Sequence, residues 1–96
     1  MYTEDRNLHF FREISRIPRK SFHEKAVVDY TQHFAEERGL RFQRDTLHNL
    51  ILWAPATPGR EGEAPLMLQA HTDMVCAKEP WSTHDFLKDP IELVEE

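Results

Sequence analysis

The residues best suited to chemistry are His71 and Asp73, which lie two positions apart at the end of an apolar run that begins at Leu66. The run lacks polar alternation, so it predicts a strand covered on both faces, as in the middle of an α/β sheet. Because side chains at i and i+2 of a strand project from the same face, His71 and Asp73 are expected side by side. They would then lie at the carboxyl end of the strand, where open α/β sheets bind their ligands.

An imidazole beside a carboxylate is a combination found in metal sites, because the carboxylate orients the imidazole and tunes its basicity. His-x-Asp alone is a weak signal, since it also occurs where a strand simply ends in a polar turn. On these residues alone, both interpretations stay open.

Residues on either side of the pair make a more specific combination. Downstream stand His84-Asp85-Phe86 and the run from Lys88 to Leu93, and upstream stand residues 14–19, Ser21, Glu24, Phe34-Ala35, Gly39-Leu40, Asp45 and Asn49. With these residues the chain resembles, from about residue 8 to residue 94, the aminoacyl-histidine (Xaa-His) dipeptidases, members of a wider group of two-zinc exopeptidases. Two positions depart from the pattern: Ala70 and His48 stand where glycine is usual.

The resemblance implies an α/β fold, the N-terminal part of a three-layer zinc-exopeptidase catalytic domain in which two helices pack on a small mixed sheet. Residues 1–96 would form a single incomplete domain. His71 would be a metal ligand, and Asp73 would be the catalytic carboxylate that fixes the imidazole and supports the metal-bound water. The complete enzyme would use two zinc ions, or other divalent metals, to hydrolyse a dipeptide. The family's bridging aspartate, general base and other ligands have no counterparts here, so the isolated chain is expected to be inactive.

Composition excludes several other classes of protein. Hydrophobic residues make up 40% and charged residues 30% of the chain, which argues against disorder. A net charge of −5 without a basic face argues against nucleic acid and anionic membranes as partners. No apolar run approaches the roughly 20 residues that span a bilayer. Cys76 is the single cysteine and no secretion signal is recognisable, so we expect a cytoplasmic protein without an internal disulfide.

Local patterns predict two helices followed by strands. The first helix is expected to start near Thr3 and to end before Pro18. The second is expected to start at a capping box formed by Ser21 and Glu24 and to end at Gly39. Strands are expected at residues 40–45, 50–54 and 66–70, with a loop at 55–65 and a short strand at 91–94.

Two helices can cover only one face of a sheet, so the doubly apolar strand leaves a surface that needs further cover. We expect the chain to expose this surface or to bury it against another copy as a homo-oligomer. The alternative to a peptidase segment is therefore a non-enzymatic interaction or self-association module from a truncated gene. A rival metal candidate is His84-Asp85, but joint ligation by adjacent residues is awkward, and anchoring of their loop is the favoured interpretation.

Overall fold

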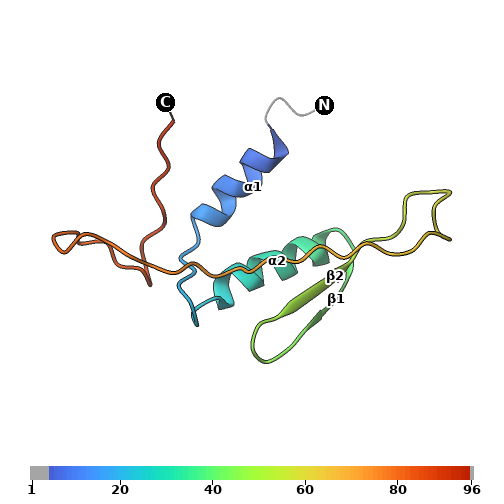
Figure 1. The fold of residues 1–96 in the computed structure, drawn as a ribbon, viewed down its shortest axis with the longest axis horizontal. Coiled ribbons are helices and arrows are strands. Elements are labelled where there is room, and N and C mark those ends of the chain that lie inside the picture. Colours follow the sequence, from blue (N-terminus) through green and yellow to red (C-terminus); the bar gives the residue numbers. More distant parts are fainter. Residues whose placement is uncertain (1–4, 96) are drawn as a thin grey trace. The chain divides into compact units, whose positions relative to one another are not determined.

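The computed structural model describes residues 5–95, which contain two helices and one two-stranded sheet (Figure 1). In chain order these are α1 (Arg6–Ser15), α2 (Lys25–Glu37), β1 (Arg41–Arg44) and β2 (Leu50–Trp53). The chain divides into two compact units, one of Met1–Val27 with Thr72–Glu96 and one of Val28–His71. No helix among the described residues has the length and apolar character needed to cross a membrane.

Helix α1 begins one residue after Asp5, whose carboxylate accepts a hydrogen bond from the Asn7 backbone N–H at 2.8 Å. Asp5 is therefore the N-cap and not a first-turn residue, while the predicted start at Thr3 lies outside the described residues. The helix ends at Ser15, before Pro18 as predicted, because a proline disfavours helical backbone in the residue that precedes it. Ser15 is buried and donates from its hydroxyl to the Phe11 carbonyl.

The start of α2 corrects the sequence prediction. The helix begins at Lys25, and Ser21 and Glu24 do not form a capping box. Glu24 instead accepts a hydrogen bond from the Phe22 N–H, and the Ser21 hydroxyl donates to Asp73. The spacing of Ser21 and Glu24 matches a capping box, but the Ser21 hydroxyl forms its hydrogen bond with a carboxylate 52 residues further along the chain.

The predicted end of α2 at Gly39 is confirmed. Gly39 has φ +64°, a left-handed conformation that glycine adopts without steric cost. The Gly39 N–H donates to the Glu36 carbonyl and the Leu40 N–H donates to the Ala35 carbonyl, which is the hydrogen-bond pattern of a Schellman cap. This cap turns the chain directly into β1.

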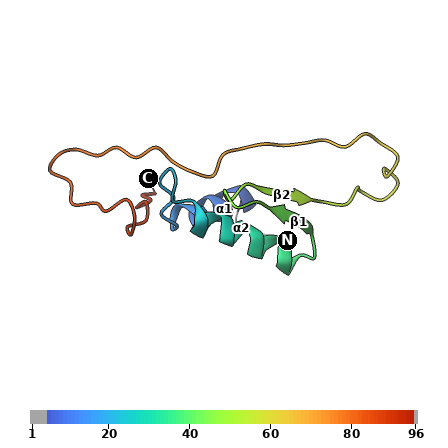
Figure 2. The same ribbon diagram turned by 90° about the horizontal axis from the view of Figure 1, so that it is seen from below.

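The hairpin of β1 and β2 confirms two predicted strands to within one residue at each end. The strands pair antiparallel, with Arg41 opposite Trp53 and Arg44 opposite Leu50, and they lie alongside α2 in both views (Figures 1 and 2). Arg44 ties the hairpin to the helix, because its guanidinium donates to Asp29 at 2.7 Å and to Gln32 at 3.0 Å. Val28 and Ala35 are the buried apolar side chains on the helix in this unit.

The turn between the strands is organised by Asp45. Its carboxylate accepts hydrogen bonds from the Leu47 N–H, the Asn49 N–H and the Asn49 side-chain amide. These bonds, the one from the Asn49 side chain first, lower the pKa of Asp45 from its ordinary value of 3.8. His48 takes φ +66°, a left-handed backbone value that is uncommon for residues other than glycine.

We predict that Asp45→Ala lowers the melting temperature of the chain by a few degrees. The stability that ionised Asp45 contributes is fully present above its unfolded pKa and is lost as pH falls through the lowered folded pKa, so the difference from wild type shrinks in acid. Thermal unfolding followed by circular dichroism between pH 7 and pH 2 measures both effects. Asp45→Asn is the control, because it keeps an acceptor for the two backbone N–H groups without the charge. Equal melting temperatures for the alanine variant and wild type at pH 7 would contradict this role.

The predicted strand at residues 66–70 is wrong for this chain, since the structure assigns no strand there. Figure 2 draws the stretch that follows β2 as a trace without a strand arrow. Residues 66–70 make no backbone–backbone hydrogen bond within the described part of the chain. A strand of this kind needs neighbours on its edges, and residues 5–95 provide none. Leu66, Met67 and Leu68 are consequently exposed, at 86%, 82% and 88%.

The predicted short strand at residues 91–94 is also absent from the described structure. This segment is attached to α1 by other means. The Ile91 N–H donates to the Ser15 carbonyl at 3.0 Å, and Glu95 forms an ion pair with Arg12 at 3.2 Å. One hydrogen bond to the end of a helix does not make a ladder, so no strand forms.

Candidate functional site

The two residues singled out by the sequence belong to different units, because the boundary along the chain falls between His71 and Thr72. His71 is the last residue of the unit Val28–His71 and is exposed. Asp73 belongs to the other unit and is half-buried. Their juxtaposition therefore stays a prediction, and each side chain is described within its own unit.

Asp73 is held by the segment between α1 and α2. Its Oδ2 accepts a hydrogen bond of 2.6 Å from the Ser21 hydroxyl. On the backbone, the Met74 N–H donates to the Arg19 carbonyl at 2.8 Å, and the Ser21 N–H donates to the Met74 carbonyl at 3.2 Å. These bonds form an isolated parallel bridge between Lys20 and Met74. A bridge of this kind sets the register between the two segments, and the register brings Ser21 to Asp73.

Sequence reasoning missed Ser21 as a site residue, because its spacing to Glu24 matched a helix N-cap. The same hydroxyl serves equally well as a donor to a distant carboxylate, and no local pattern separates the two uses. The one sequence signal that could have singled out Ser21 is its position close to Arg19 and Glu24, among the residues that carry the family resemblance.

Zinc requires three or four protein ligands in a structural or catalytic site. Among residues 5–95, no group of three or more histidine, cysteine, aspartate or glutamate side chains is arranged to hold a metal ion. His71 and Asp73 therefore match zinc in the kind of donor they offer, but the described residues do not supply enough donors to complete a site.

The rival pair His84-Asp85 organises its own loop. Asp85 accepts hydrogen bonds from the Leu87 N–H at its carboxylate and from the Asp89 N–H at its carbonyl, and its own N–H donates to the Asp89 carboxylate. The His84 ring lies against Phe86, with ring centroids 5.4 Å apart. These contacts agree with the interpretation that the pair anchors its own loop, because the Asp85 carboxylate accepts a backbone hydrogen bond within a turn.

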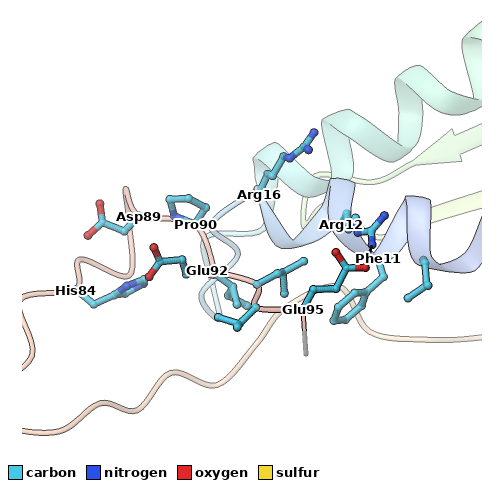
Figure 3. Close-up of a pocket in the computed structure, with 12 residues that line it drawn as sticks. Phe11, Arg12, Arg16, His84, Asp89, Pro90, Glu92 and Glu95 are labelled. Carbon is cyan, nitrogen blue, oxygen red and sulfur yellow. Dashed lines mark hydrogen bonds and ion pairs between the residues drawn. The ribbon is translucent and has the colours of Figure 1, made fainter. Parts of the chain in front are cut away.

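A pocket of about 710 Å³ lies between α1 and the C-terminal segment (Figure 3). Leu8, Phe11 and Ile91 contribute apolar walls, and the Arg12–Glu95 ion pair crosses one side. Figure 3 shows His84 and Asp89 at the other end of the pocket. Neither His71, the predicted metal ligand, nor Asp73, the predicted catalytic carboxylate, lines this pocket.

Comparison with known proteins gives two close similarities, although no protein-family model matches the chain. The chain is 43% identical over 82 residues to the cytosol non-specific dipeptidase of Escherichia coli (strain K12). The match covers 85% of this chain and 17% of that protein. The fold matches the crystal structure of the aminoacylhistidine dipeptidase from Vibrio alginolyticus with a TM-score of 0.86 and 41% identity. That match covers 92% of this chain and 18% of the Vibrio chain.

The chain thus spans under a fifth of the length of each dipeptidase that it matches. The expected α/β class is confirmed, since two helices and a small sheet reproduce part of the dipeptidase fold. The sequence match and the structure match are both to dipeptidases, and they cover 85% and 92% of this chain. The resemblance seen in the sequence is confirmed: this chain is similar, in sequence and in fold, to a segment of an aminoacylhistidine dipeptidase.

Proposed function

We propose that this chain is the N-terminal segment of a zinc-dependent dipeptidase that hydrolyses Xaa-His dipeptides. The observation that carries the proposal is the 0.86 TM-score at 41% identity, over 92% of the chain, with an aminoacylhistidine dipeptidase. At this identity and coverage, the matched segment is expected to keep its role as well as its fold. Residues 1–96 would be one incomplete part of a catalytic domain.

Within this proposal His71 is one zinc ligand and Asp73 is the carboxylate that orients it. Imidazole and carboxylate are donors that zinc accepts, and the remaining ligands would come from other parts of the complete enzyme. Zinc in such a site activates water for attack on a peptide carbonyl. The E. coli relative is named as a cytosolic enzyme, and the single cysteine, Cys76, suits the same reducing compartment.

The proposal is tested by a chimera in which this chain replaces the matching 82-residue segment of the E. coli dipeptidase. We expect the chimera to hydrolyse alanyl-histidine in the presence of zinc, because the transplanted segment would supply its part of the site. The isolated chain under the same conditions is expected to show no turnover, since no group of three or more metal-binding side chains forms among residues 5–95. A folded chimera without activity, or turnover by the isolated chain, would contradict the proposal.

A second candidate is a self-association module without enzymatic activity. The observation that favours it is the contiguous exposure of Leu66, Met67 and Leu68 on an extended segment. Contiguous apolar surface of this kind marks interaction sites more often than scattered apolar residues do.

A further inference from the structure

The hydrogen bond between Ser21 and Asp73 joins two segments of the same unit. The Oγ–Oδ2 distance is 2.6 Å, within the short range of hydrogen bonds from a hydroxyl to an ionised carboxylate. Both residues are half-buried, so water competes with this bond less than it would on an open surface. The bond restrains the Asp73 side chain about both of its torsions, the χ1 rotamer that brings the carboxylate to Ser21 and the terminal torsion of the carboxylate itself.

Ser21 itself is held by a tight turn. The His23 N–H donates to the Lys20 carbonyl at 2.8 Å, which closes a four-residue turn with Ser21 and Phe22 at its centre. Phe22 has φ +70°, a value that favours glycine at the third position of a type II turn. The Phe22 side chain is 95% exposed, so its own packing does not stabilise this backbone.

The unfavourable backbone of Phe22 is maintained by bonds on both sides of it. Glu24 accepts from the Phe22 N–H at 2.7 Å, and the bridge to Met74 fixes the chain just before the turn. Strained residues persist only where the surrounding structure determines their conformation, and they are common beside functional groups. Here the group presented by the strained turn is the Ser21 hydroxyl.

We infer that Ser21 is a positioning residue that fixes the direction of the Asp73 carboxylate. The inference rests on the proposed function for its catalytic consequence, because Asp73 acts there by orienting His71. A carboxylate that is free to rotate orients an imidazole poorly, and a donor on one of its oxygens removes that freedom. Groups that support the residues around a metal in this way typically affect activity by about 10- to 100-fold.

The first test reads the Asp73 side chain directly in the 96-residue chain. Three-bond couplings between the Asp73 α and β protons, measured by NMR, report whether one rotamer is populated. We expect a single rotamer in wild type, averaged couplings in Ser21→Ala, and a single rotamer again in Ser21→Thr, which keeps the hydroxyl. Unchanged couplings in Ser21→Ala would overturn the inference whatever the chain's activity.

The second test measures catalysis in the dipeptidase chimera. Ser21→Ala is expected to lower kcat about 10- to 100-fold with little change in KM, and Ser21→Thr is expected to restore most of it. Ser82→Ala is the matched control, because Ser82 is a half-buried loop serine whose hydroxyl accepts a hydrogen bond from the neighbouring His84 N–H. A kcat within twofold of wild type for Ser21→Ala would overturn the inference.

The two tests distinguish a failure of the proposed function from a failure of the role inferred for Ser21. An inactive chimera contradicts the proposed function, while averaged Asp73 couplings in Ser21→Ala would still support the positioning of the carboxylate. An active chimera that tolerates Ser21→Ala keeps the proposed function and removes the role of Ser21.

Discussion

His71→Ala in the dipeptidase chimera is expected to lower kcat/KM for alanyl-histidine by about a thousandfold or more. Loss of a metal ligand removes several kcal/mol of transition-state stabilisation, and each 1.4 kcal/mol or so corresponds to a tenfold change in rate. The measurement is steady-state hydrolysis with zinc in excess, together with the bound zinc per protein determined by elemental analysis. Both activity and zinc content should fall.

The matched control for this variant is His33→Ala. His33 is exposed on α2 and pairs with Glu37 one turn later, an arrangement that contributes little to stability. We expect this chimera to keep wild-type activity and zinc content. If His71→Ala retained full turnover, His71 would have no part in the reaction, and the metal-ligand prediction would be wrong.

The second large effect concerns the exposed apolar segment. We expect the isolated chain to bind an apolar dye and to self-associate as its concentration rises, because Leu66, Met67 and Leu68 lie together in the solvent. Burial of each such side chain is worth about 1.5–3 kcal/mol. The combined variant Leu66→Thr, Met67→Gln and Leu68→Thr should therefore weaken association by more than about tenfold. Analytical ultracentrifugation over a range of concentrations measures the effect.

A control variant keeps the number of polar substitutions but scatters them. Leu47→Thr, Trp81→Gln and Val94→Thr change side chains that are similarly exposed, at 79%, 80% and 83%, but lie in separate places along the chain. Dye binding and association should change little in this variant. A strictly monomeric wild-type chain that binds no dye would contradict the prediction that the exposed side chains of residues 66–68 drive association.

The same triple substitution separates the two candidate functions when it is placed in the chimera. If the segment belongs inside a dipeptidase, the apolar residues are covered in the complete enzyme, and polar replacements should lower its melting temperature and activity. If the segment serves only self-association, the wild-type chimera should already lack activity.

Helix ends and turns could be predicted from the sequence where a single short-range residue pattern determines them. Gly39 ends α2 because a left-handed residue closes that cap, and the two hydrogen bonds of the cap join residues at most five positions apart. The hairpin was predictable for a similar reason: Asp45 and Asn49 bond to each other within the turn. His48, which stands where glycine is usual in the family pattern, has the left-handed φ of +66° within this turn.

Predictions failed where an element depends on partners beyond its own neighbourhood. The stretch at 66–70 has the composition of a central strand, yet a strand requires edges to pair with, and the described residues offer none. The Ser21 hydroxyl had two compatible uses, as a helix cap or as a donor to a remote carboxylate. Only the bridge between Lys20 and Met74 selects the second.

Short-range residue patterns predicted the cap of α2 and the two strands of the hairpin, while motifs spread along the chain predicted the family resemblance and, through it, the α/β class. The tertiary structure alone decided that Ser21 meets Asp73, that α2 starts at Lys25, and that the apolar run stays exposed. The physical reason is the same in each case: hydrogen bonds and apolar contacts between distant segments depend on which partners the fold brings within reach.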